Sequence, residues 1–175
     1  MNLVFRLFKV LFRFFILPRR IGILEESRVR FRVWPSDLDT NGHMNNGRYL
    51  TLMDLGRLDL LLRTGAVRVA VKHRWYPVLA ATQVRFRRPL NLFQKFEIST
   101  RIAGWDGKWV FLEQKIIRGD FVILHAYLKG VFVGKQGSVA ITELLTRMGI
   151  TQPPPPLPES LAGWLRAERA MAENP

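Results

Sequence analysis

The chain has 175 residues, which suits one domain with a buried core and short additions at its ends. It contains no cysteine, and this excludes a disulfide scaffold, a thiol nucleophile and a cysteine-ligated metal. The formal net charge of +13 calls for an anionic partner, which nucleic acid, a lipid surface or a phosphorylated ligand would each provide.

Residues 1–24 form a cationic and apolar segment that holds no acidic residue. On a helix, Arg6, Lys9 and Arg13 fall on one narrow stripe, and most of the remaining surface is apolar. No apolar run approaches the ~20 residues that span a bilayer, and the interrupting cations disfavour a signal peptide. We therefore expect residues 1–20 to dock as an interfacial helix, cations toward anionic headgroups. The alternative is a helix packed on the protein's own surface or on a partner.

A polar loop over residues 36–46 follows a strand-like run from Val29 to Trp34. The loop gathers Asp39, Asn41 and His43 directly ahead of a helical pattern. A strand, a polar loop and a helix N-terminus in succession bring reactive side chains close to unpaired backbone N–H groups. This order of elements is typical of a binding or catalytic site.

One long helix is predicted to begin at Asn45 or Asn46, to run to Arg63 and to stop at Gly65. One of its faces is apolar or small, and it carries Tyr49, Met53, Gly56 and Leu60. The Gly56 notch would let another backbone approach closely. A helix this apolar needs cover on most of its sides.

Four later segments are rich in β-branched and aromatic residues and are predicted to be strands: Val78–Arg88, Lys95–Ile102, Val110–Arg118 and Phe121–Val133. The pair Asp106-Gly107 marks a hairpin between two of them. One strand, one long helix and a run of antiparallel strands describe an α+β architecture with the sheet wrapped around the helix.

A proline-rich break at Pro153–Pro158 separates a terminal helix, Glu159–Glu173, from the rest of the chain. We therefore divide the chain into an amphipathic helix and linker over 1–24, a main domain over 25–137, and a helical, proline-rich appendage over 138–175.

The main domain resembles the hot-dog-fold thioesterases, both the 4-hydroxybenzoyl-CoA thioesterase type and the long-chain acyl-CoA thioesterases. The resemblance lies in a strand, the loop pattern D-x-D-x-x-G-H-x-N-N and the helix behind it, and it covers about residues 27–137. The matching positions are Asp37, Asp39, Gly42, His43, Asn45, Asn46, Tyr49, Asp54 and Arg57. Asp39, Asn41 and His43 also match the D-x-N-x-H order of plant acyl-ACP thioesterases.

This resemblance implies hydrolysis of acyl thioesters, with fatty acyl-CoA as the expected substrate. The backbone N–H of Asn46 and the helix dipole would stabilise the oxyanion. Asp39 would act as base or nucleophile, Asn41 would hold the substrate or the water, and His43 would act as base or orient Asp39. A thioester is electrophilic enough for such a carboxylate site, so we expect no metal and no cofactor.

The substrate carrier is expected to be coenzyme A or acyl carrier protein, and both are anionic. Arg85, Arg87 and Arg88 are the candidates for binding it, and the resemblance adds Tyr49 to the substrate-binding set. Solvated sheet faces also carry such cations for solubility alone. Nucleic acid is not expected as a partner, because the chain has no recognisable nucleic-acid-binding module.

The resemblance further implies a homodimer or a dimer of dimers. From the N-terminal helix we expect a cytoplasmic protein that is peripherally associated with the membrane. Other interpretations stay open, since aspartate and asparagine also brace tight turns. The chain has no acidic residue between Asp59 and Glu97, where plant acyl-ACP thioesterases place a further acid. A non-catalytic acyl-binding or lipid-binding hot-dog protein is therefore the alternative, and a hot-dog dehydratase is a weaker one.

Overall fold

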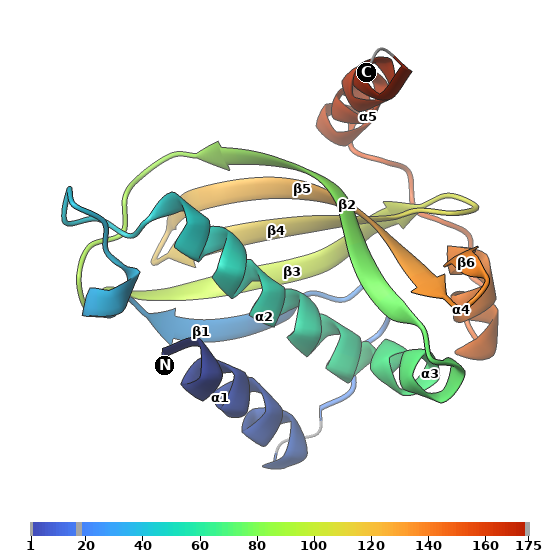
Figure 1. Ribbon diagram of the computed structural model, residues 1–175, viewed down its shortest axis with the longest axis horizontal. Coiled ribbons are helices and arrows are strands. Elements are labelled where there is room, and N and C mark those ends of the chain that lie inside the picture. The colour runs from blue at the N-terminus through green and yellow to red at the C-terminus, as the bar shows by residue number, and fades with distance from the viewer. Residues whose placement is uncertain (1, 17–18, 174–175) are drawn as a thin grey trace.

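The computed structural model describes residues 2–16 and 19–173, in which an antiparallel sheet curls around a long central helix (Figure 1). The strands are β1 (Ser27–Arg32), β2 (Tyr76–Phe86), β3 (Lys95–Trp105), β4 (Val110–Arg118), β5 (Phe121–Gly134) and β6 (Gly137–Val139). The helices are α1 (Asn2–Ile16), α2 (Asn46–Thr64), α3 (Ala66–His73), α4 (Ile141–Arg147) and α5 (Glu159–Glu173). The sheet order is β1-β3-β4-β5-β2, and β6 pairs with β5.

Helix α2 begins and ends where the sequence predicts. The Oδ1 atom of Asn45 accepts a hydrogen bond from the N–H of Gly47 at 2.8 Å, so Asn45 is the N-cap. Gly65 ends the helix in the left-handed conformation with φ of 83°. A Cβ atom at Gly56 would lie 2.8 Å from side-chain atoms of Ile98 and Thr100. Side chains of the sheet, rather than the backbone that we expected, therefore occupy the space next to Gly56.

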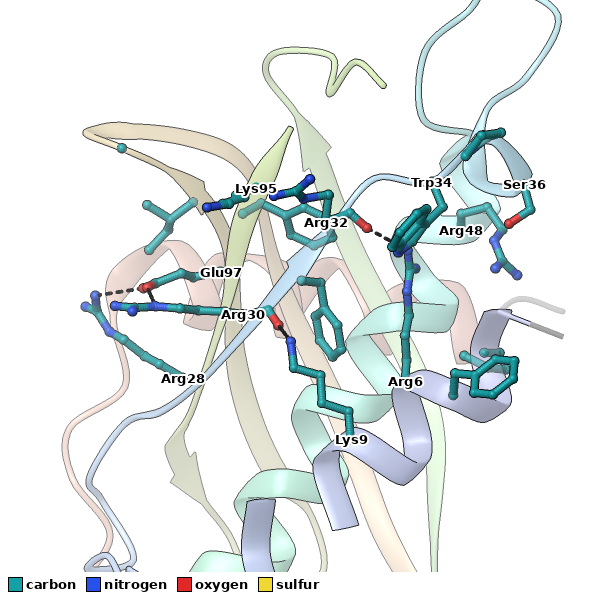
Figure 2. Close-up of a pocket in the computed structure, with 17 residues that line it drawn as sticks. Arg6, Lys9, Arg28, Arg30, Arg32, Trp34, Ser36, Arg48, Lys95 and Glu97 are labelled. Atoms are coloured by element: carbon teal, nitrogen blue, oxygen red, sulfur yellow. Dashed lines mark hydrogen bonds and ion pairs between the residues drawn. The ribbon is translucent and has the colours of Figure 1, made fainter. Parts of the chain in front are cut away.

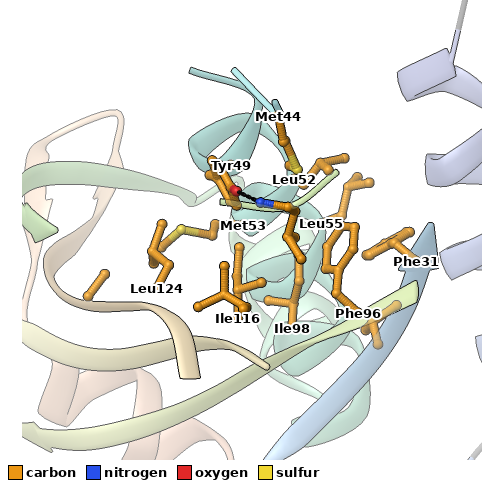
Figure 3. Packing of buried hydrophobic residues seen from close by; sticks show 14 of the residues in the cluster. Phe31, Met44, Tyr49, Leu52, Met53, Leu55, Phe96, Ile98, Ile116 and Leu124 are labelled. Atoms are coloured by element: carbon orange, nitrogen blue, oxygen red, sulfur yellow. Dashed lines mark hydrogen bonds between the residues drawn. The ribbon is translucent and has the colours of Figure 1, made fainter. Parts of the chain in front are cut away.

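The main core lies between α2 and the concave face of the sheet (Figure 3). Its buried side chains from the loop and helix include Met44, Tyr49, Leu52, Met53 and Leu55, and those from the sheet include Phe31, Phe96, Ile98, Ile116 and Leu124. Burying a side chain of this size contributes about 1.5–3 kcal/mol. The core therefore fixes α2, and with it the loop at its N-terminus, against the sheet.

A second core surrounds the C-terminal half of α2 and includes α4, a helix that is not predicted from the sequence. Ile141, Leu144 and Leu145 of α4 are buried there with Leu60 of α2 and Phe132 of β5. Helix α4 is thus part of the packed domain, although it lies in the segment 138–175 that we expected to be an appendage. Helix α5 packs separately, through buried leucines on a cluster that includes Phe111 and Tyr127.

Helix α1 lies beside the edge strand β1 (Figure 1). Its cationic stripe faces that strand. Arg6, Lys9 and Arg13 donate hydrogen bonds to the carbonyl oxygens of residues 32, 30 and 28 at 2.7, 2.7 and 3.0 Å. An edge strand presents unpaired carbonyl groups, and the three cations satisfy them in alternation. This differs from the expectation that these cations point to lipid headgroups. The alternative, a helix packed on the protein's own surface, describes this side of α1.

The outward face of α1 is apolar. The exposed fractions of Phe5, Phe8, Phe12 and Phe15 are 67, 63, 66 and 75%. On the opposite face Val10 is fully buried. Among the described helices none has the length and apolar character needed to cross a bilayer. Of the segment 1–20, residues 1, 17 and 18 lie outside the described residues.

Candidate active site

Asp37 anchors the polar loop from inside the protein. Its carboxylate is fully buried and accepts hydrogen bonds from Arg6 at 2.5 Å, from Arg48 at 3.1 Å and from the backbone N–H of Trp34 at 2.8 Å. Its carbonyl oxygen accepts the N–H of Asn45 at 2.8 Å. Asp37 therefore ties α1, the loop and the start of α2 together.

Asp39 lies two residues further on, half-buried, in a tight turn. Its Oδ1 atom accepts a hydrogen bond from the N–H of Asn41 at 2.9 Å, and its own N–H donates to the carbonyl of His43 at 2.8 Å. Gly42 closes the turn with φ of 74°. Within the described residues the second carboxylate oxygen of Asp39 has no hydrogen-bond partner. The turn therefore holds the carboxylate while leaving one oxygen available.

Asn41 and His43 are exposed on the same turn. Asn41 supports Asp39 through its backbone N–H, so its exposed side-chain amide is not used to hold the turn. His43 forms an isolated bridge with Asn91, and across the described part of the chain its imidazole has no hydrogen bond to Asp39. The structure thus brings the predicted residues together in one loop without a preformed His–Asp pair.

The backbone N–H of Asn46 is the first in α2. The next three N–H groups of the helix, at residues 47 to 49, are all bonded to Asn45: one to its side chain and two to its carbonyl oxygen. The N–H of Asn46 has no acceptor in residues 2–16 and 19–173. The positive end of the helix dipole adds to this donor, so the position suits a developing oxyanion.

Tyr49 braces the site from behind. It is 2% exposed, and its Oη atom accepts the N–H of Leu90 at 3.0 Å, while its ring packs edge-on against Phe86 at 5.6 Å. Burial raises the pKa of Tyr49; the Leu90 N–H opposes this shift, and the nearby charge of Asp39 adds to it. A buried tyrosine whose hydroxyl is engaged by the backbone positions the segment 86–91. Contact between Tyr49 and substrate stays a prediction.

Arg85, Arg87 and Arg88 lie together at the end of β2. They line an open hollow of about 560 Å³, with Asp120 and Phe121 on its other side. The guanidinium of Arg88 stacks over the ring of Phe121 at 4.1 Å. Phe86 also lines this hollow and packs against the ring of Tyr49, so the hollow adjoins the N-terminal part of α2. Binding of an anionic carrier by these arginines stays a prediction.

An apolar cavity of about 350 Å³ lies beside the C-terminal half of α2. Leu58 and Leu61 of α2, Leu79 of β2 and Leu144 of α4 are among its walls. Arg57 is the cation at its edge; burial lowers the pKa of Arg57 to about 10, so it stays protonated at neutral pH. Ligand pockets begin at about 300 Å³, and this lining suits a hydrocarbon chain.

Sequence reasoning missed Arg6 and Arg48, the two side chains that hold Asp37. A buried carboxylate needs cationic or N–H partners, so the loop pattern signals that some partner exists. Arg48 is only 11 positions from Asp37 in the sequence, so it could have been proposed as that partner. No sequence feature pairs Arg6 with a residue 31 positions away.

Comparisons with known proteins agree with this fold. The sequence matches the family described as "Thioesterase-like superfamily" over residues 33–165. Protein THEM6 of Xenopus laevis is 30% identical over 171 residues, covering 91% of this chain and 81% of that protein. The structure resembles YbaW, a probable thioesterase of Escherichia coli, with a TM-score of 0.65 and 24% identity over 69% of this chain and 94% of that one.

A mutant 4-hydroxybenzoyl-CoA thioesterase solved with 4-hydroxybenzoyl-CoA is also similar in structure. Its TM-score is 0.62 at 16% identity, covering 68% of this chain and 97% of that one. At these identities the solved structures show the fold alone. They confirm the α+β hot-dog architecture that the loop and helix pattern predicts.

Proposed function

The chain belongs to the thioesterase-like superfamily, and we propose that it hydrolyses fatty acyl thioesters with Asp39 as the catalytic carboxylate. Family membership supports thioester hydrolysis as the reaction class. One observation carries the assignment of the site: a half-buried carboxylate with a free oxygen precedes a helix whose first N–H, that of Asn46, has no acceptor in the described chain.

In the proposed reaction the thioester carbonyl lies against the N–H of Asn46. Asp39 either removes a proton from the attacking water or attacks the carbonyl carbon itself. Negative charge then develops on the carbonyl oxygen, where the N–H and the helix dipole stabilise it. The carbon–sulfur bond breaks and the sulfur leaves as a thiolate. If Asp39 acts as a base, the proton that it took from water passes to the thiolate; if Asp39 acts as a nucleophile, water then hydrolyses the acyl anhydride on Asp39 and supplies that proton. Asn41 and His43, exposed on the same turn, would hold the water or the departing group.

The acyl group is proposed to enter the apolar cavity beside α2. Its walls are leucines and other apolar side chains, with Asp54 and Arg57 at one edge. The carrier, coenzyme A or acyl carrier protein, would lie on the arginines at the end of β2, whose guanidinium groups suit phosphates.

Filling the cavity is expected to shorten the preferred acyl chain. Leu61 is half-buried in the cavity wall, so Leu61→Trp would place a bulky indole ring in the space that we assign to the acyl chain. We expect kcat/KM for long-chain acyl-CoA to fall about tenfold or more, and kcat/KM for short-chain acyl-CoA to change little. Thiol trapping over a series of chain lengths measures both.

The control for Leu61→Trp is Val71→Trp, since Val71 is 72% exposed on α3 and lies outside the cavity lining. Its chain-length profile should match that of the unmodified protein. An unchanged profile in Leu61→Trp would remove the cavity from the acyl path and leave the Asp39 assignment in place.

A homodimer is proposed through the free edge of β2. This strand is 11 residues long, none of them is buried, and it lies at the end of the sheet order opposite β1. Helix α1 covers the edge at β1, but no described element pairs with the outer edge of β2. An open edge of this length readily pairs with another strand. The exposed Asn41, His43 and Asn46 would then gain a second wall from the partner.

A glutamate at Thr82 is expected to weaken this dimer. Thr82 lies near the middle of β2 and is exposed in the single chain. Two-fold pairing would bring the two introduced charges close together, and such like-charge contacts cost several kcal/mol. We expect Thr82→Glu to raise the dimer dissociation constant by about a hundredfold or more, measured by sedimentation velocity. Thr151→Glu, exposed outside the sheet, should sediment like the unmodified chain; a monomeric unmodified protein would disprove the dimer.

We also propose that the enzyme works at the cytoplasmic membrane surface. Support comes from the four exposed phenylalanines of α1, since an uncharged aromatic face of this kind suits the headgroup and acyl boundary. Long acyl chains and fatty acid products partition into lipid, so docking would keep substrate and product close to the site.

A further inference from the structure

A wide groove runs between α1 and the outer side of β1, with a volume of about 1460 Å³. Seven of its lining side chains are cationic and one, Glu97, is a carboxylate. Figure 2 shows Arg6 and Lys9 reaching into the groove from α1, and Arg28, Arg30, Arg32 and Lys95 from β1 and β3; Arg48 comes from α2.

Part of this positive charge is already neutralised. Arg6 and Arg48 are bound to the buried Asp37, and Arg28 and Arg30 pair with Glu97. The other three cations have no acidic partner in the described part of the chain.

These three unneutralised cations are Lys9, Arg32 and Lys95. Arg32 and Lys95 are exposed and lie opposite each other in the β1–β3 register. Burial lowers the pKa of Lys9, and the like charges of Arg13 and Arg6 lower it further. The groove therefore has a net positive field that favours an anion.

The groove adjoins the apolar face of α1. Phe5 belongs to both surfaces, and Trp34, 46% exposed, also lines the groove. Val4, Phe8, Phe12, Phe15 and Ile16 continue the exposed face of the helix. A soluble anion would explain the cations but not this row of apolar side chains. An anionic bilayer offers phosphates and hydrocarbon side by side, as this surface does.

We infer that the groove between α1 and β1 is an anionic phospholipid headgroup site, with the apolar face of α1 inserted beside it. Arg32 and Lys95 bind the phosphates, whereas Arg6, Lys9 and Arg13 donate to the carbonyl oxygens of the sheet edge. This deepens the membrane-surface part of the proposed function and rests on it. Trp34 lies in the segment that leads into the Asp37–Asp39 loop, so a docked bilayer comes close to the catalytic turn.

Vesicle sedimentation tests the site with the full chain. The unmodified protein should bind phosphatidylcholine vesicles containing phosphatidylserine more tightly than vesicles of phosphatidylcholine alone. Arg32→Glu/Lys95→Glu should lower the partition coefficient on the anionic vesicles about tenfold or more. The control Lys135→Glu/Arg166→Glu has the same change in net charge at exposed positions outside the groove. Its partition coefficient on the anionic vesicles should fall by less than a third of the factor found for Arg32→Glu/Lys95→Glu, that is by less than about threefold.

A second variant tests the insertion. Phe8→Gln/Phe12→Gln should reduce binding to both kinds of vesicle, because these side chains are exposed and lie outside the core. All variants should keep the thermal midpoint and the hydrolysis of a short-chain, water-soluble thioester. That readout separates this inference from the thioesterase assignment.

Three results would overturn the headgroup site. Equal losses in the groove variant and its charge-matched control would assign the preference to net charge alone. Equal binding to both vesicle types would show that the protein binds membranes without recognising an anionic headgroup. Binding to duplex DNA that depends on Arg32 and Lys95, with no vesicle binding, would assign the groove to a different partner.

Discussion

We expect Asp39→Asn to lower kcat for thiol release from acyl-CoA by about 10³-fold. This lies within the rate enhancement of about 10²- to 10⁴-fold that a positioned acid or base contributes. Asparagine has the size of aspartate, and its Oδ1 atom still accepts the N–H of Asn41. The turn is therefore kept. The amide, however, is neither a base nor a nucleophile, so both forms of the proposed mechanism fail. Steady-state thiol trapping measures the loss.

A matched control for this substitution is Asp106→Asn. Asp106 also holds a tight turn, where its Oδ1 atom accepts the N–H groups of Lys108 and Trp109 at 3.0 and 2.7 Å. It lies in the β3–β4 hairpin, away from α2's N-terminus. We expect Asp106→Asn to keep normal turnover. Turnover in Asp39→Asn within threefold of the unmodified protein would sink the role of Asp39.

Arg6→Met is expected to cost about 3 kcal/mol of the free energy of unfolding, since breaking a buried ion pair strands a desolvated charge. Arg6 is 5% exposed and Asp37 is fully buried, and Arg48 is the other cation that reaches this carboxylate. For a chain of this size the loss corresponds to a fall of about 10 °C in Tm. We also expect kcat to fall, because Asp37 holds the loop that carries Asp39. Calorimetry and thiol trapping measure the two effects.

The control for Arg6→Met is Arg13→Met on the same helix. Arg13 donates to the exposed carbonyl oxygen of Arg28, and losing such a bond costs about 1 kcal/mol or less. Equal changes in Tm for the two variants would show that the Arg6–Asp37 pair has no special weight. Helix α1 is therefore part of the folded domain. Deleting residues 1–20 would remove both the Arg6–Asp37 pair and the core residue Val10.

Local signals in the sequence predict the central helix and most of the sheet. Asn45 and Gly65 are residue types with strong cap preferences, and both caps occur as expected. The strand Val110–Arg118 is found with the predicted bounds, and other strands differ by a few residues at their ends. Hydrophobic periodicity and turn residues suffice for such elements because they depend on neighbours in the chain.

Other features depend on contacts that no local pattern records. The stripe of Arg6, Lys9 and Arg13 fits a lipid surface and a sheet edge equally well, and only the position of β1 decides between them. Helix α4 is too short for a clear periodic signal, and its burial against α2 and β5 decides its place. The hydrogen bond from the Leu90 N–H to the Tyr49 hydroxyl joins residues 41 positions apart, so the sequence does not predict it.

The loop itself was predicted as a site from residue types and order, and the structure adds its geometry. Asp39, Asn41 and His43 do lie on one turn ahead of α2. The free oxygen of Asp39 and the free N–H of Asn46, both judged within the described residues, were beyond the reach of the sequence. Their roles in catalysis are proposals that rest on this geometry and on the family.

Thiol release by the purified full chain, over a panel of acyl-CoA chain lengths, tests the central claim most directly. We expect saturable turnover in which free thiol and free fatty acid appear in equal amounts, with little turnover in Asp39→Asn. A chain that binds acyl ligands saturably but releases no thiol from any member of the panel would contradict it. That result would identify a non-catalytic acyl-binding protein built on the same fold.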